Sequence, residues 1–238
     1  MKTFFISHRS QHHARYSGYN RILDYYPDAI VINGVSKVPY RLARFISLMH
    51  NQKAGIYNSD SVFKEIELYN KLQTYKNETA IVHYQNAERD IRHLVSRRKN
   101  YGNLHFCGTF HKPPKTLNFQ ISNPKYIKHL DAAIVVGKNQ VDYIREHLKI
   151  NKVAYIPHGI DTEFFVPKIT NRKSYKVLFV GQHLRDFEAL NYCVPRIAEK
   201  IKNFNVSVVL HPAYAKKIKP HKCVSVYTNL NDEELKLQ

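Results

Sequence analysis

The sequence has only three cysteines, and they do not form the pattern of a disulfide framework or a zinc site. Cys107, Cys193 and Cys223 are odd in number and far apart, and no C-x-x-C pair is present. Disulfide-stapled domains and structural zinc sites need closely spaced sets of cysteines. This usage fits a reducing compartment, so the sequence predicts a cytoplasmic protein without a metal site.

Long hydrophobic runs are also missing. No apolar run approaches the roughly 18 residues that a membrane-spanning helix needs. The apolar patch within residues 1–10 is too short for the hydrophobic region of a secretory signal. Membrane contact is therefore expected only at the surface, as a peripheral association with the inner face of the membrane.

Acidic residues are scarce relative to basic ones. The chain has 37 Lys plus Arg against 19 Asp plus Glu, a formal net charge of +18 spread along its length. Such a charge favours anionic partners, namely nucleic acid, an acidic membrane surface or phosphorylated small molecules. The alternative is a solvated basic surface. The 17 tyrosines are scattered and no RRM, KH or helix-turn-helix signature appears, which argues against nucleic acid.

The remaining composition is that of an ordinary globular protein, with 43% hydrophobic and 24% charged residues. Short apolar runs typical of strands buried on both faces recur along the first two thirds of the chain. They span residues 3–7, 29–33, 79–84, 104–110, 132–137 and 152–157. Helical patterns alternate with them, which predicts an α/β fold with a mostly parallel sheet.

Two of these helical patterns are well defined by their apolar spacing. The first, in residues 38–50, has its apolar positions at Leu42, Phe45, Ile46 and Met49. The second, in residues 61–75, has them at Val62, Ile66, Tyr69 and Leu72. We expect each set to form the buried face of a helix.

A second α/β unit follows a polar, basic linker at residues 166–176. The pattern predicts strands at 176–181, 206–211 and 223–227, and helices at about 186–202 and from an N-cap at Asn231 or Asp232. Three parallel strands bury little surface, so this second domain is expected to be incomplete. The expected domains are residues 1–165 and 166–238.

Three segments place polar residues where ligands bind in α/β proteins. Ser17 and Gly18 open a helix after the first strand, a place for phosphate or sugar hydroxyls, although an ordinary turn is the alternative. His111 follows a buried strand and precedes two prolines, so its imidazole is expected at the carboxyl edge of the sheet; a structural histidine is the alternative. Arg185 follows a strand and a glycine, and would bind a diphosphate or pair with a neighbouring carboxylate.

The basic stretch at residues 89–100 is expected to form one helix. Its apolar residues would pack inward, and its basic residues would face a phosphorylated surface or simply solvent. The inward set is Ile91, Leu94 and Val95, and the basic set is Arg89, Arg92, His93, Arg97 and Lys99.

Five segments together resemble GT-B fold glycosyltransferases of the GT4 class. The sequence VAYIPHGIDTEFF, at residues 153–165, is similar to the segment where that family crosses between its two domains, with a Pro-(His/Asn)-Gly-(Ile/Val)-Asp motif. Four further segments resemble the family in the same chain order, at residues 12–27, 108–114, 132–148 and 180–190. The resemblance implies a Rossmann-like N-terminal acceptor domain and a Rossmann-like C-terminal donor domain.

The resemblance also implies transfer of a sugar from a nucleotide-diphosphate sugar, with retention and without an obligatory metal or a bound cofactor. A saccharide or lipid-linked acceptor would complete the reaction. In this picture His111 faces the transferred sugar or its phosphate and is the catalytic residue, and Arg185 neutralises the leaving diphosphate. Ser17, Gly18, His158 and Gly159 would line the donor and acceptor sites, with Gly159 letting the backbone turn.

One departure from the family pattern stands out. The family has two glutamates separated by seven residues in its C-terminal domain, and no two glutamates here have that spacing. We therefore expect the chain to resemble a family member truncated in that domain and to be weakly active or inactive. The competing hypotheses are a basic nucleic-acid-binding protein and a noncatalytic remnant that binds acceptor or membrane.

Overall fold

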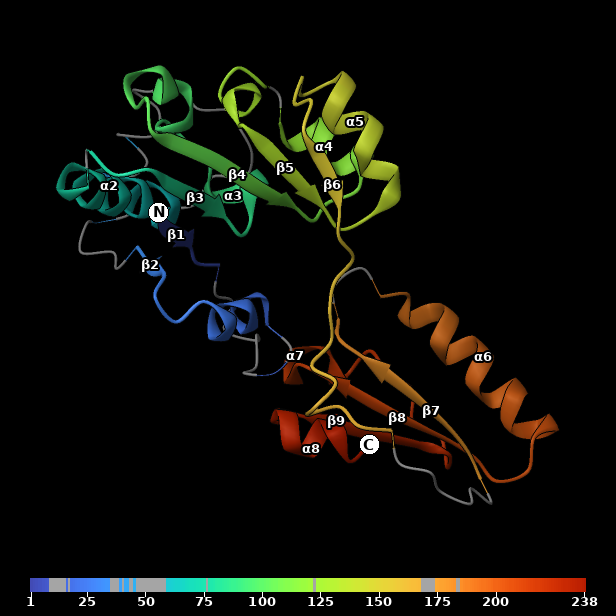
Figure 1. The fold of residues 1–238 in the computed structure, drawn as a ribbon. Helices are drawn as coiled ribbons and strands as arrows, with labels where there is room; N and C mark the ends of the chain where they lie inside the picture. Colours follow the sequence, from blue (N-terminus) through green and yellow to red (C-terminus); the bar gives the residue numbers. More distant parts are fainter. Residues whose placement is uncertain are drawn as a thin grey trace. The chain divides into compact units, whose positions relative to one another are not determined.

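Two separate parallel β-sheets organise the chain, one in each of two compact units (Figure 1). The computed structural model describes residues 1–8, 16, 18–34, 39, 41–42, 45, 59–75, 77–121, 123–167, 174–182 and 185–238. The first unit comprises Met1–His13 and Gly18–Gly159, and the second comprises Ala14–Ser17 and Ile160–Gln238. The longer segment of the second unit begins at Ile160, and the sequence-based prediction puts the domain boundary after Phe165.

The sheet of the first unit has six strands, all parallel, in the order β2-β1-β3-β4-β5-β6. They are β1 (Lys2–Ile6), β2 (Ile30–Ile32), β3 (Ala80–Tyr84), β4 (Leu104–Phe110), β5 (Ala132–Val135) and β6 (Val153–Tyr155). Each lies within one of the six predicted apolar runs or differs from it by a single residue at one end, so the expected α/β fold with a parallel sheet is confirmed.

Helices connect these strands and pack on the sheet (Figure 1). They are η1 (Tyr19–Tyr25), α2 (Ser59–Thr74), α3 (Ala87–Asp90), η2 (Val95–Asn100), α4 (Pro114–Gln120), η3 (Ile127–His129), η4 (Lys138–Gln140) and α5 (Val141–Glu146). The helix predicted at residues 38–50 lies largely outside the described residues, so that prediction stays a prediction.

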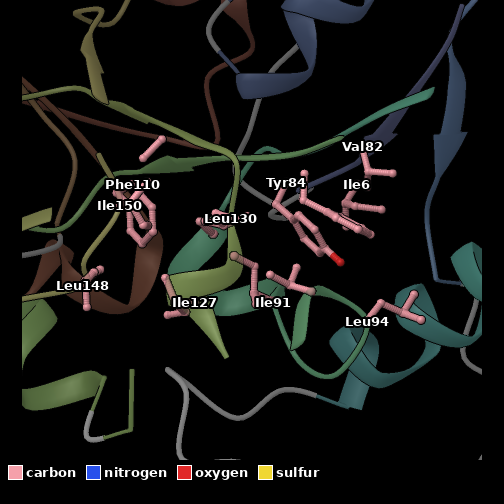
Figure 2. Packing of buried hydrophobic residues seen from close by; sticks show 14 of the residues in the cluster. Ile6, Val82, Tyr84, Ile91, Leu94, Phe110, Ile127, Leu130, Leu148 and Ile150 are labelled. Atoms are coloured by element: carbon pink, nitrogen blue, oxygen red, sulfur yellow. The ribbon is translucent and has the colours of Figure 1, made fainter. Parts of the chain in front are cut away.

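One hydrophobic core lies between this sheet and its helices. Figure 2 shows Ile6 and Val82 from neighbouring strands close to the ring of Tyr84, with Ile91 beside it. All four residues have 0% exposure. Each Å² of apolar surface that this core removes from water stabilises the fold by about 25 cal/mol.

The buried face of α2 differs from the predicted one. Val62 and Leu72 are buried as expected, but Ile66 is 44% exposed and Tyr69 is 45% exposed. The buried face includes the carboxylate of Glu65, which is 7% exposed. Its oxygens accept hydrogen bonds from the Tyr84 hydroxyl and from three consecutive backbone N–H groups at residues 92–94. Because Glu65 must face the sheet to form these hydrogen bonds, the helix is rotated so that Ile66 and Tyr69 are partly exposed. The apolar spacing in the sequence does not show that Glu65 is buried.

The single helix predicted at residues 89–100 is also wrong. The chain forms α3, leaves the helical conformation at Ile91 and then forms the 3₁₀ helix η2. Ile91, Leu94 and Val95 are buried as predicted, but Arg92 is only 4% exposed and donates to its own neighbour's carbonyl oxygen. The break lets the N–H groups of residues 92–94 reach Glu65, so this segment presents less positive charge than expected.

The second unit contains a three-stranded parallel sheet in the order β7-β8-β9. Its elements are β7 (Tyr175–Val180), α6 (Phe187–Lys200), β8 (Phe204–Leu210), α7 (Pro212–Ala215), β9 (Val224–Thr228) and α8 (Asp232–Lys236). Phe187 and Val194 of α6 pack on the face of β8 that bears Val206 and Val208. Asn231 caps α8 as predicted, in a capping box with Glu234.

Candidate functional site

The strand order of the first sheet creates a switch point between β1 and β3. From β1 the chain crosses to β2 on one side, and β3 then pairs with the other side of β1. Open α/β sheets bind ligands outside the carboxyl ends of their strands at such a point. Here His8 follows β1 and Gln85 follows β3, and the backbone N–H of His8 donates to Oε1 of Gln85 at 3.1 Å. The carboxyl edge of the first sheet is therefore the candidate functional site.

Three rings are stacked at this edge, from Tyr19, His111 and His158. The ring centroids of Tyr19 and His111 are 4.3 Å apart, and those of His111 and His158 are 5.2 Å apart. Tyr19 begins η1, His111 follows β4, and His158 follows β6. Three segments that are distant in sequence thus bring their rings to one place, as the parallel arrangement of the strands requires.

The two histidines form a hydrogen-bonded chain that ends on a backbone carbonyl. Nε2 of His111 lies 2.7 Å from the carbonyl oxygen of Gln85, and its Nδ1 lies 3.4 Å from Nε2 of His158. Because a carbonyl oxygen only accepts, Nε2 of His111 bears a proton. In the neutral ring Nδ1 then accepts from the Nε2–H of His158. Partial removal of the ring from water lowers the pKa of His158, which favours this neutral pair.

This arrangement leaves Nδ1 of His158 as an acceptor. Within the part of the chain that the structure describes, no hydrogen bond to that atom is formed, and the His158 residue is exposed. A hydroxyl placed there could donate its proton to His158. The positive charge that results would be stabilised through His111 and the carbonyl dipole of Gln85. The sequence pointed to His111 as the group that meets a ligand, whereas both of its ring nitrogens have protein partners.

A buried carboxylate holds the backbone of His111. Oε1 of Glu88 accepts hydrogen bonds from the N–H groups of His111 at 3.0 Å and Lys112 at 3.1 Å. Glu88 is 1% exposed, and burial raises its pKa to about 7 against the opposing effect of these backbone bonds and the charge of Lys112. Close packing of α3 on β4 permits this contact, because a Cβ at Gly108 would lie 2.8 Å from Cβ of Ala87.

Gln140 fixes the other side of the same loop. Its Nε2 donates to the carbonyl oxygens of Phe110 at 3.2 Å and Lys112 at 2.7 Å, and the side chain is 2% exposed. The sequence analysis did not single out Gln140, Glu88, Gln85 or Tyr19. Gln85 and Glu88 could have been found by their position, because each is a polar residue within four positions of the end of the buried strand β3.

The other residues predicted for the site are placed as follows. Gly18 caps η1 in the first unit, and Ser17 lies outside the described residues. Gly159 also belongs to the first unit, but its φ is not in the left-handed range, and none of the described residues other than its two chain neighbours has an atom within 4 Å of a Cβ placed there. The expectation that a glycine is needed for the backbone turn at this position is therefore wrong.

Arg185 belongs to the second unit, after β7. Its Nε donates to the carbonyl oxygen of Val180 at 3.1 Å, and the residue is exposed. Gly181 between them has a φ of 92°, a left-handed conformation that favours glycine. The carboxylates predicted as alternative partners are those of Asp186 and Glu188, and Asp186 instead caps α6 by accepting from the N–H of Ala189. The guanidinium is thus held at the carboxyl end of β7 by the backbone and not by an ion pair with Asp186.

The described residues contain neither a candidate membrane span nor a candidate metal site. No helix among them has both the length and the apolar character needed to span a bilayer. No group of three His, Cys, Asp or Glu side chains among them is placed to hold a metal ion.

The sequence matches no protein-family model and no curated protein. Solved structures with a similar fold include the glycosylation-associated protein complex Gap123 from Streptococcus agalactiae, with a TM-score of 0.46 and 12% identity over 73% of this chain. A glycosyltransferase from Rickettsia africae gives 0.47 and 15% over 91%, and MnaA with UDP from S. aureus gives 0.50 and 10% over 97%. The chain spans 38%, 58% and 69% of these proteins, respectively. At such identities the likeness to MnaA establishes only the fold, which is Rossmann-like.

Proposed function

We propose that this chain belongs to a glycosyltransferase that moves a sugar from a nucleotide-diphosphate donor to an acceptor hydroxyl, with retention at the anomeric carbon. The observation that supports this most directly is the chain of hydrogen bonds from His158 through His111 to the Gln85 carbonyl, at the switch point of a Rossmann-like sheet. Support also comes from the Pro-His-Gly-Ile-Asp motif and from the shared fold of MnaA, which was solved with UDP.

Each residue has a defined role in this proposal. His158, supported by His111, accepts a hydrogen bond from a sugar or acceptor hydroxyl. The guanidinium of Arg185 neutralises charge on the nucleotide diphosphate as it leaves. Gly18 and Gly159 supply backbone around the ligand. Positioning and charge stabilisation would provide most of the rate, and no bound cofactor or metal takes part.

The activity of the 238-residue chain alone is expected to be weak. The sequence contains no two glutamates separated by seven residues, and in the GT4 class such a pair contacts the donor. Binding is therefore a better first test than turnover. Isothermal titration with UDP-, GDP- and ADP-sugars is expected to find one that binds in the millimolar range or tighter.

Substitution then assigns the binding to the proposed residues. Arg185→Ala is expected to weaken binding roughly tenfold, the effect of about 1.4 kcal/mol from one lost charge-assisted hydrogen bond. His105→Ala is a matched control, because His105 lies exposed on β4, away from its carboxyl end. Equal loss of binding in both variants would contradict the proposal. So would a chain that binds no sugar nucleotide but binds DNA with an affinity that falls as the salt concentration rises.

We further propose an acceptor that is a saccharide presented near an anionic membrane surface. Arg97 and Lys99 are exposed on η2, whereas Arg98 is paired with Asp131. With the net charge of +18, these side chains would attract acidic lipid over about one Debye length. Sedimentation with vesicles containing phosphatidylserine, compared with neutral vesicles, tests this. Equal sedimentation with both would contradict it.

A further inference from the structure

The short segment after β3 holds His111 by both its ring and its backbone. The carbonyl oxygen of Gln85 accepts from the ring at 2.7 Å. Three residues further on, Oε1 of Glu88 accepts from the N–H groups of His111 and Lys112. A ring fixed at one nitrogen could still tilt about that bond. The second attachment removes this freedom, because it fixes the peptide from which the ring extends.

Close packing between α3 and β4 restricts the position of the Glu88 backbone. Ala87 lies against Gly108 of β4 so closely that a Cβ at Gly108 would be 2.8 Å from Cβ of Ala87. The side chain of Glu88 is therefore delivered to the end of β4 by two rigid elements, α3 and the sheet. Its second oxygen, Oε2, is buried and has no hydrogen-bond partner among the described residues. A carboxylate that is buried for fold stability alone would normally have both oxygens satisfied.

We propose that Glu88 is a positioning residue, whose carboxylate aligns His111 and, through it, the acceptor nitrogen of His158. The structural part of this proposal stands on the contacts above. Its catalytic consequence rests on the proposed function, because only there does His158 meet a substrate hydroxyl. Glu88 touches no substrate in this account and acts only through the loop that it holds.

The charge of Glu88 should then regulate the alignment. An ionised carboxylate accepts backbone hydrogen bonds about twice as strongly as a neutral one. With a pKa raised to about 7 by burial, Glu88 changes its charge in the neutral range. The groups that face it are Lys112, which favours the charge, and Tyr19, whose own pKa is raised by burial and then by the charge of Glu88. Its own helix adds the charged residues Arg89 and Asp90. The loop is expected to be held tightly above pH 7 and more loosely below it.

Nuclear magnetic resonance of the full chain tests this without any substrate. The amide signals of His111 and Lys112 are expected to titrate together with a midpoint near pH 7, the pKa of Glu88. Glu88→Gln keeps both hydrogen bonds to an uncharged oxygen, so this shared titration should disappear while the Nε2–H form of the His111 ring is retained. Glu88→Ala removes both bonds, and the ring nitrogen shifts of His111 should move toward the average of the two tautomers. Glu146→Gln, on the exposed side of α5, is the matched control and should change none of these signals.

Three results would overturn the proposal. The first is the absence of an amide titration that Glu88→Gln abolishes. The second is an unchanged His111 tautomer in Glu88→Ala, and the third is a Glu146→Gln variant with the same effects as Glu88→Gln. If Glu88→Ala does not fold, the isosteric Glu88→Gln variant still decides the matter. If nucleotide sugars prove not to bind while the titration behaves as expected, the proposed function fails and the positioning role stands.

Discussion

The first strands of the two units are both apolar, but they differ in how much of their side chains is buried. In the first unit, β1 lies between β2 and β3, and Phe4 and Phe5 are 0% and 3% exposed. In the second unit, β7 lies at the edge of its sheet, and Val177 and Leu178 are 45% and 47% exposed. Apolar residues of the kind found in buried parallel strands are thus half-exposed in β7. The edge position alone does not explain this, because Ile32 of the edge strand β2 in the first unit is 0% exposed.

The same difference extends to the candidate ligand sites. In the first unit, side chains from several elements fix the carboxyl edge, and Glu88 and Gln140 are both almost fully buried there. In the second unit, Arg185 at the carboxyl end of β7 is exposed and is bonded to one carbonyl oxygen. A broad sheet therefore gives a rigid site, and a narrow one gives a site whose position depends on few contacts.

Removal of a large side chain should distinguish the two strands most clearly. Phe4→Ala in β1 empties a fully buried position and is expected to destabilise the first unit by about 3–5 kcal/mol. Leu178→Ala in β7 removes a half-exposed side chain and should cost the second unit about 1 kcal/mol. Denaturant titration followed by resolved amide signals measures each unit separately. Equal losses would show that β7 is covered in solution.

The pH dependence of stability should report the buried charge of Glu88. Burial raises its pKa from 4.5 to about 7, so between these values the folded chain keeps a proton that the unfolded chain has lost. Stability from this group is therefore present below pH 4.5 and lost as the pH rises to 7. Glu88→Gln should gain up to about 3 kcal/mol over the wild type between pH 4.5 and 8.

His83 provides the opposite sign in the same unit. Burial lowers its pKa from 6.5 to about 4, so its contribution is lost as the pH falls through that window. In the wild type the effects of Glu88 and His83 on stability have opposite signs and partly cancel as the pH falls. In Glu88→Gln only the effect of His83 remains, so the free energy of unfolding should decrease as the pH falls from 6.5 to about 4. Glu188→Gln, exposed on α6 of the second unit, is the control and should follow the wild type at every pH. A constant difference between Glu88→Gln and the wild type would contradict this explanation.

Replacement of Gly108 or Gly181 by alanine should lower stability, for a different reason at each position. Gly108→Ala introduces a contact of 2.8 Å with Ala87 and should destabilise the first unit by about 1–3 kcal/mol. The double variant with Ala87→Gly should recover most of this loss. Gly181→Ala forces a non-glycine residue to a φ of 92° and should destabilise the second unit by about 1–2 kcal/mol. Thermal unfolding of the three variants measures both effects, and a failure of the double variant to recover stability would exclude the packing explanation.

Local patterns in the sequence were enough to predict the strands and the cap of α8. Apolar runs mark strands because both faces of a parallel sheet are buried, and Asn231 lies three residues before Glu234 as a capping box requires. The buried face of α2 could not be predicted in this way. Glu65 is buried because it binds backbone N–H groups 27 to 29 residues away, and apolar periodicity contains no information about such a partner.

The candidate site was predictable only in outline. The position of His111 at the end of a buried strand follows from chain order and sheet geometry. The state of its ring nitrogens depends on Gln85 and His158, which are distant in sequence, and so it needs the structure. The need for glycine at position 159 was inferred from a motif, whereas the backbone there accepts other residues.

The most direct test of the account is a titration of the histidine ring signals with nucleotide-diphosphate sugars, followed by nuclear magnetic resonance. The account predicts that one donor shifts the ring signals of His158 and His111 in a saturable way and leaves those of His105 unchanged. No shift at His158 with UDP-, GDP- or ADP-sugars at millimolar concentration, or equal shifts at His105, would contradict a ligand site at the carboxyl edge of the first sheet.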